Sequence, residues 1–215
     1  MELGASLKRL RKYMKISLQK NEKYIIGRFD HAAETISSSF YNGGKGKRNG
    51  FFILQVERDF NTDDPSSLAR GFERSMDLDR YVGFLTAVNL SRNTFLQEDE
   101  RFFILATIGL GHHCIPGKIC KRSRTINIIS VVKERLTENA AMDLLSVMIS
   151  TKVFSLTSRG YGAGTPSDSF MLSYLKGSDI FYGGFATDIG RALSSLILKI
   201  MEDGIREWER SGVED

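Results

Sequence analysis

The spacing of apolar residues changes along the chain, and each pattern predicts a different kind of element. In the first twenty residues, apolar side chains recur every three or four positions, which predicts a short amphipathic helix with a basic outer face. Beyond residue 22, branched, aromatic and other apolar residues gather in short runs, as they do in half-buried strands. Strands are therefore predicted at 23–29, 51–60, 81–89, 101–110, 126–133 and 170–175.

Further helices are predicted from capping residues together with helical spacing. Asp64 is suited to cap a helix that has Pro65 at its first position. Thr137 is suited to cap a long second helix, and either Gly160 or Gly162 can end it in a left-handed conformation. A final helix is predicted near the C-terminus, where apolar residues again recur at helical spacing.

These elements follow one another in the order αββαβββαβα. Consecutive strands without crossover helices argue against a doubly wound parallel sheet. We therefore expect an α+β, or layered α/β, fold with a mixed, largely antiparallel sheet and long helices packed on it. The 215 residues include only three prolines and no low-complexity tract, so we divide the chain into a basic N-terminal helix or arm at 1–22 and one domain at 23–215.

Charge and hydropathy limit the partners that we expect. The formal net charge is +4, and six lysines and arginines in the first twenty residues face only Glu2. A basic arm can touch nucleic acid or anionic lipid, but we interpret this one as a solvated helix face and expect no nucleic-acid partner. The chain has no apolar run of about 18 residues, so no membrane span is expected, and the basic N-terminus lacks the apolar segment of a secretory signal.

The two cysteines, Cys114 and Cys120, are interpreted as free thiols of a reduced compartment, and the predicted location is cytoplasmic. Their spacing is not a zinc signature. His112, His113 and Cys114 bring soft ligands together, but adjacent side chains rarely converge on one ion, and no fourth ligand stands out. No metal site is predicted.

Three segments combine glycines with acid, amide or hydroxyl groups: 37–46, 160–169 and 182–190. A phosphate cradle requires a strand, then a glycine loop, then a helix, whereas the segment GYGAGTPSDSF at 160–170 follows a helix and leads into a strand. Turns alone can explain each segment. Because they recur at the ends of helices and strands, where loops often carry function, we take them as candidates for ligand contact.

The sequence resembles the adenosylcobinamide amidohydrolases of corrinoid salvage in several stretches that follow one another in the family's order. The matching stretches are TISSSFYNGG (35–44), DPSSLARGFERSMDLDRYVGFLTAV (64–88), ATIGLGHHCIPG (106–117), TINIISVVKERLTENAAMDLLSVMISTKVFSL (125–156), GTPSDSF (164–170) and YGGFATDIGRAL (182–193). The resemblance implies that 23–215 is a single catalytic domain. The chain departs from the family pattern at His112, where asparagine is usual, and at Asp188, where glutamate is frequent.

The implied activity is hydrolysis of one amide, which cuts the aminopropanol arm from adenosylcobinamide and releases adenosylcobyric acid. The resemblance implies no cofactor, because cobalt enters only as part of the corrinoid. The implied partner is this corrinoid small molecule, and self-association into a homo-oligomer stays open. The alternative is a non-enzymatic corrinoid- or nucleotide-binding protein that uses the same glycine-rich loops.

Amide hydrolysis needs an activated nucleophile, a donor for the oxyanion and a proton for the leaving amine. Asp168 is the first candidate for a general base or for a group that orients one, although aspartate after Pro-Ser also caps its own turn readily. Ser38 or Ser39 is a candidate nucleophile. His31 is the nearest histidine in sequence and is a candidate base, with a structural role as the alternative.

The remaining candidates are for substrate binding. A corrin ring requires a wide cleft with apolar walls and several amide-binding groups. Candidate wall residues are Phe40, Tyr41, Tyr161, Phe181, Tyr182 and Phe185. Candidate substrate-binding residues are Asn42, Gly43, Gly44, Gly164, Thr165, Ser167, Tyr182, Gly184, Thr187, Asp188 and His112.

Overall fold

The structure is a computed structural model that describes residues 13–58, 60, 62–111, 114–120 and 124–211. Within these residues it contains eight strands and three helices. Their order is β1 (Ile16–Lys20), β2 (Tyr24–Ser37), β3 (Gly44–Gln55), α1 (Pro65–Ser75), β4 (Tyr81–Thr86), β5 (Thr94–Glu98), β6 (Phe102–Ile108), β7 (Ile126–Leu136), α2 (Glu138–Thr157), β8 (Ser169–Lys176) and α3 (Asp188–Arg210).

The strands form one mixed sheet in the order β4-β3-β2-β8-β7-β6-β5, and β1 pairs with β2 outside this path. The pairs β3–β4 and β7–β8 are parallel, whereas the other pairs are antiparallel. Each parallel pair is joined through a helix, as parallel strands require. The predicted α+β fold with a mixed, largely antiparallel sheet is therefore confirmed.

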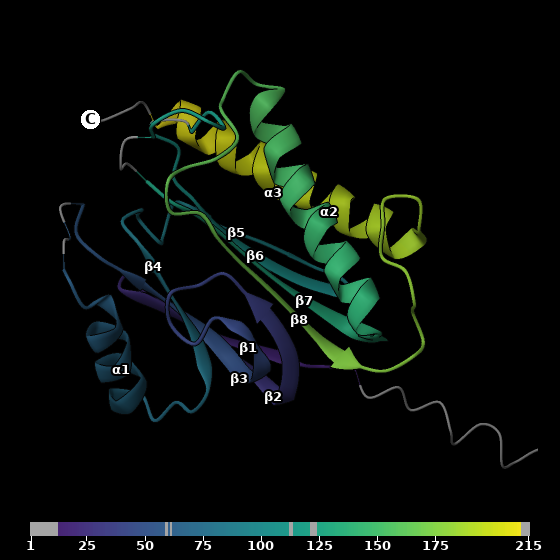
Figure 1. Cartoon of the computed structure of the whole chain (residues 1–215). Coiled ribbons are helices and arrows are strands. Elements are labelled where there is room, and N and C mark those ends of the chain that lie inside the picture. The colour runs from purple at the N-terminus through teal and green to yellow at the C-terminus, as the bar shows by residue number, and fades with distance from the viewer. Residues whose placement is uncertain (1–12, 59, 61, 112–113, 121–123, 212–215) are drawn as a thin grey trace, which may run out of the picture.

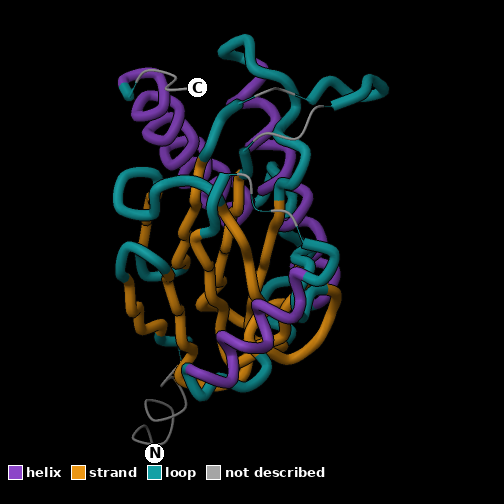
Figure 2. Tube along the Cα trace, turned by 90° about the vertical axis from the view of Figure 1, so that its left-hand side faces the viewer, coloured by secondary structure: helices purple, strands orange, loops and turns teal. Residues whose placement is uncertain are grey.

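The sheet is strongly curled, so that its two halves face each other across an apolar layer. Phe51 of β3, Phe103 of β6 and Ile129 of β7 belong to this inner layer. Helix α1 covers the outer face of β3 and β4, while α2 and α3 lie side by side over β5, β6, β7 and β8 (Figures 1 and 2). The curl also brings the edge of β4 against β7, where the Asn127 side chain donates to the Leu85 carbonyl at 3.2 Å.

The predicted helix boundaries are confirmed by the capping contacts. Asp64 Oδ1 accepts from the Ser67 N–H at 3.0 Å, and Thr137 Oγ1 accepts from the Ala140 N–H at 3.2 Å. At the end of α2, Gly160 has a φ of 79°, the left-handed conformation expected of a C-terminal glycine.

Several predicted elements need correction. The N-terminal helix is wrong at Ile16–Lys20, which form β1 antiparallel to β2, while residues 1–12 lie outside the described residues. β5 was not predicted. The segment 37–46, which turns alone could explain, reaches into β3, because Gly44–Gly46 already belong to this strand. β3 ends at Gln55, whereas the strand was predicted to reach residue 60. β1 and β5 lie at the margins of the sheet and expose many side chains, so their apolar pattern is weak.

The prediction of two free thiols is also wrong, because Cys114 and Cys120 form a disulfide with their Cα atoms 5.1 Å apart. The spacing of five intervening residues allowed this pairing, since the loop folds back on itself. The predicted cytoplasmic location loses this support and stays a prediction. Helix α2 is long and apolar enough to cross a membrane by length and composition, and half of its most apolar window is buried inside the structure.

Candidate functional site

The Asp168 carboxylate lies at the start of β8, where it accepts hydrogen bonds from four donors. Thr165 supplies its hydroxyl at 2.5 Å and its N–H at 3.2 Å, and the Ile126 N–H donates at 3.1 Å. The fourth donor is the ammonium group of Lys152 on α2, at 2.6 Å. The side chains of Lys152 and Asp168 are only 5% and 9% exposed, so this is a buried ion pair. It ties α2, β7 and β8 together at one end of the sheet.

Gly164 allows the chain to approach this ion pair closely. A Cβ atom at position 164 would lie 2.3 Å from Asp168 Oδ2 and 2.5 Å from Lys152 Nζ. The carbonyl of Gly164 accepts from the Cys114 N–H at 2.9 Å, and the Ala163 N–H donates to the Cys114 carbonyl at 2.9 Å. The disulfide-closed loop at 114–120 is therefore paired with the loop that carries Asp168.

The serines at the end of β2 reach the same region from the other side. The Ser38 N–H donates to the Phe170 carbonyl at 3.0 Å, and the Phe170 N–H donates to Ser38 Oγ at 3.0 Å. Ser38 is exposed, and its hydroxyl proton is free to point outward. Ser39 is buried, and its hydroxyl donates to the Gly83 carbonyl of β4. Of the two serines, Ser38 is thus the one that a ligand can reach.

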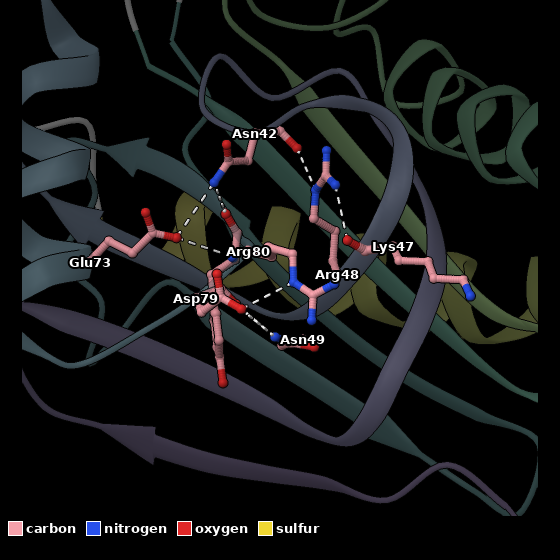
Figure 3. A network of polar contacts seen from close by, with 8 residues as sticks. Asn42, Lys47, Arg48, Asn49, Glu73, Asp79 and Arg80 are labelled. Carbon is pink, nitrogen blue, oxygen red and sulfur yellow. Dashed lines mark hydrogen bonds and ion pairs between the residues drawn. The ribbon is translucent and has the colours of Figure 1, made fainter.

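The turn at Asn42–Gly44 follows Ser39 but is occupied by structural contacts (Figure 3). The side-chain amide of Asn42 donates to the Tyr81 carbonyl at 2.8 Å, and the backbone carbonyl of Asn42 accepts from Arg48 Nε at 2.9 Å. Gly43 is required because a Cβ there would lie 2.1 Å from the Ser39 carbonyl oxygen. Gly44 has a φ of 73°. These contacts hold the β2–β3 turn against β4, and they engage the Asn42 side-chain amide in the fold.

Tyr41 is buried beside this turn and donates to Glu73 Oε2 at 2.6 Å. Burial, together with the hydrogen bond and the negative charge of Glu73, raises the pKa of Tyr41 to about 12. Tyr41 therefore belongs to the interior rather than to a cleft wall.

His31 does not lie near the serines. It lies within the irregular stretch of β2 between Arg28 and Ala33, and Ser38 is seven residues farther along the chain, about 23 Å of extended strand. His31 Nδ1 lies 2.6 Å from Asp30 Oδ1 without hydrogen-bonding alignment. In this structure it cannot act as the base for Ser38 or Ser39. Among the described residues, no three His, Cys, Asp or Glu side chains are grouped to hold a metal ion.

The third glycine segment lies at the opposite end of α2. The Gly183 N–H donates to Asp143 near the start of α2 at 3.1 Å, and Asp143 precedes Lys152 by nine residues, about 14 Å of helix. Thr187 caps α3 through the Gly190 N–H at 3.0 Å and donates to the Gly184 carbonyl at 2.8 Å.

Most side chains of this segment face solvent, whereas Ile189 is buried in the core. Asp188 is exposed and pairs with Arg191 in the first turn of α3. Tyr182, Phe181 and Phe185 are exposed as well. We conclude that the segment 182–190 is not assembled with Ser38 and Asp168. His112 lies outside the described residues.

The other candidate residues are distributed between the two ends of α2. Ser167 is exposed beside Asp168, and its Oγ lies 2.6 Å from Thr125 Oγ1 and donates to the Arg124 carbonyl at 3.2 Å. Phe40 is exposed next to Ser39. Tyr161 contacts Glu209 of α3. The structure therefore groups Ser38, Gly164, Thr165, Ser167 and Asp168 into one site.

Two features of this site escaped the sequence reasoning. Lys152 had one usable signal, since it is a lone lysine among the inward-facing residues of a helix. The other feature is a hollow of about 340 Å³ that borders the site and is lined by mostly polar groups. Arg124 connects the two, because it lines the hollow while its carbonyl accepts from Ser167. No local motif marks the hollow, since its walls come from four separate segments of the chain.

A family model and a known protein that match this chain carry the same description. The model of a family described as adenosylcobinamide amidohydrolase matches residues 7–212. A relative from Methanosarcina mazei, also described as adenosylcobinamide amidohydrolase, is 30% identical over 185 residues, which cover 80% of this chain and 90% of the relative. The matched range includes every residue of the site described above.

Proposed function

We infer the reaction from the premise that this chain belongs to the adenosylcobinamide amidohydrolase family and is a hydrolase acting on an amide bond. We propose that it cleaves the amide that joins aminopropanol to the corrin periphery of adenosylcobinamide, releasing adenosylcobyric acid for corrinoid salvage. The observation that carries the proposal is the family match over residues 7–212, which includes both loops of the site. Cobalt enters as part of the substrate, and the proposed hydrolysis consumes only water.

The proposed chemistry places the scissile carbonyl against Ser38. Hydrolysis adds the oxygen of water to the carbonyl carbon, breaks the C–N bond and leaves the amine with an added proton. Ser38 Oγ accepts the Phe170 N–H, so its own proton can be given to the substrate or to a water. In this proposal Ser38 either attacks the carbonyl or orients the attacking water.

The buried pair of Lys152 and Asp168 has a supporting role in this proposal. Lys152 brings a fixed positive charge to a low-dielectric position beside the loop, and such charges stabilise a developing oxyanion more strongly than they would in water. Its ammonium group also lies 5.4 Å from the centre of the Phe170 ring, whose backbone holds Ser38. The pair therefore acts on the same short segment of β8 that positions the serine.

The proposal is tested by incubating the purified protein with adenosylcobinamide and following both products by mass spectrometry. We expect adenosylcobyric acid and aminopropanol to appear in equal amounts. Ser38→Ala should lower kcat by about 100-fold or more. Ser39→Ala is the matched control, because its buried hydroxyl contacts Gly83 and should affect stability more than turnover. Tight binding of the corrinoid by a folded sample without any product would reject the proposed hydrolysis.

A further inference from the structure

The hollow beside the site is lined by Asn93, a largely buried residue whose side-chain amide opens into the hollow. Asn93 is 8% exposed, and it lines the hollow. Its backbone is fully used, since its N–H donates to the Asn89 carbonyl at 2.9 Å and its carbonyl accepts from the Ile108 N–H at 3.0 Å. Its side-chain amide, in contrast, makes no hydrogen bond with any residue that the structure describes. The amide atoms are not fully enclosed by protein, so they open into the hollow, where a ligand can pair with them.

An aromatic surface forms another wall of the same hollow. Trp208, near the end of α3, is the only tryptophan of the chain, and the Arg124 guanidinium lies over its ring at 4.9 Å from the centroid. Flat guanidinium and indole groups are the surfaces on which heterocyclic bases stack. A side-chain amide offers one acceptor and two donors, which match the amino group and ring nitrogen of adenine.

We propose that this hollow binds the 5′-deoxyadenosyl group of the corrinoid, with the adenine base stacked along Arg124 and Trp208 and hydrogen-bonded by Asn93. The inference rests on the proposed function, because it names the part of that substrate which the hollow takes. A volume of about 340 Å³ is at the small end of ligand sites, which suits a nucleoside-sized group but not a corrin ring. A single amide arm of the corrin would leave the aromatic wall uncovered.

The position of the hollow relative to Ser38 agrees with the layout of the substrate. The adenosyl group is attached at the central cobalt, whereas the scissile amide hangs from the ring's edge, so the two groups need separate sites. Arg124 precedes Ile128 by four residues, about 13 Å of extended chain, and Ile128 pairs with Phe170, which holds Ser38. A corrinoid lying across this end of the sheet can therefore place one group in each site.

The binding part of this proposal is tested without turnover. Because Trp208 is the only tryptophan and lines the hollow, its fluorescence reports on the hollow directly. Titration with 5′-deoxyadenosine should give a saturable change. 5′-Deoxyinosine, in which an oxygen replaces the amino group of 5′-deoxyadenosine, should bind about 10-fold or more weakly than 5′-deoxyadenosine. Asn93→Ala should weaken the binding of 5′-deoxyadenosine by a similar factor. Asn49→Ala, an asparagine near the middle of β3 that holds Asp79, is the matched control.

Two results of the titration would overturn the proposal. One is the absence of a saturable change with 5′-deoxyadenosine, and the other is equal binding to Asn93→Ala and to the unaltered protein. A change caused by inorganic phosphate alone, with displacement of the nucleoside, would show an anion site formed by Arg58, Arg92 and Arg124, which line the hollow, and would also reject the proposal. Asn93→Asp is the second variant. It keeps the shape of the side chain but replaces the two amide donors by a charged carboxylate oxygen, so it should also weaken the binding of 5′-deoxyadenosine.

Kinetics separate this inference from the proposed function. The ratio of kcat/KM for adenosylcobinamide to that for cobinamide carrying cyanide in place of adenosyl should exceed 10, and it should fall toward one in Asn93→Ala. Turnover with an unchanged ratio would reject the adenosyl site and keep the hydrolase. The absence of turnover with either corrinoid, in a protein that still binds 5′-deoxyadenosine, would reject the proposed function and keep the nucleoside site.

Discussion

Replacing Asp168 by alanine is expected to lower the free energy of unfolding by about 3 to 5 kcal/mol, because the change strands a buried ammonium group. Lys152 is 5% exposed and has Asp168 as its hydrogen-bond acceptor at 2.6 Å. The same change removes the acceptor of the Ile126 and Thr165 N–H groups. A domain of this kind has about 5 to 15 kcal/mol of stability in all, so the variant should be folded only marginally.

Replacing Lys152 instead of Asp168 should lower the free energy of unfolding by a smaller amount. Lys152→Met removes the buried cation and leaves the carboxylate with three hydrogen-bond donors, so we expect a loss of about 1 to 3 kcal/mol. In the double variant, Lys152→Met with Asp168→Ala, no buried charge remains. Its loss should therefore be smaller than the sum of the single losses, with an interaction free energy of about 0.5 to 3 kcal/mol.

Urea denaturation of the four proteins, followed by circular dichroism at equal ionic strength, measures this cycle. Thr157→Ala, near the end of α2 on its exposed side, is a control for substitution in the helix. A loss below about 1 kcal/mol for Asp168→Ala, or strict additivity in the double variant, would refute the reasoning. Either outcome would mean that Lys152 reaches water or another partner when Asp168 is removed.

Three further outcomes follow from other contacts. Gly164→Ala should reduce turnover strongly and lower the free energy of unfolding by about 1 to 3 kcal/mol, because its Cβ would lie 2.3 Å from a carboxylate oxygen. Gly160→Ala should lower the free energy of unfolding by about 1 kcal/mol and retain turnover. Urea denaturation and the product assay compare the two variants. Stability should fall as the pH rises from about 10 toward 12, because the pKa of Tyr41 is raised to about 12 in the folded state, and Tyr41→Phe should flatten this part of the pH profile of the urea midpoint. Replacing Cys114 and Cys120 together by serine should lower the free energy of unfolding by about 2 kcal/mol, as expected for a short closed loop, and an unchanged midpoint would show that the cross-link adds no stability.

The elements with strong local signals were predictable from the sequence. The helix starts at Asp64 and Thr137 were read from their capping residues, and both cap contacts are present. The buried strands β6 and β7 were read from long apolar runs. β1 and β5 were missed because the position of a marginal strand is set by backbone pairing with a neighbour, which leaves little trace in its own side chains.

The site was less predictable because it depends on contacts between distant residues. Ser38 and Phe170 are 132 positions apart, and nothing in either segment shows that they meet. The segments around Ser38, Asp168 and Thr187 look alike in composition, yet the last lies at the far end of α2. Local sequence shows that a loop is polar and glycine-rich, but it does not show at which end of the sheet the loop lies.

The contacts of Asp168 also bear on whether it moves a proton or only holds its loop. An ionised carboxylate has about four lone-pair sites, and four donors already point at this one. A substrate proton could be accepted only after one of these contacts is broken. Because Ser38 rests on Phe170, two residues beyond Asp168, a displaced loop would move the serine as well. We therefore expect a positioning role, in which Asp168→Asn retains more activity than Asp168→Ala and added acetate does not restore the alanine variant. Restoration by acetate with an unchanged KM would instead identify Asp168 as the general base.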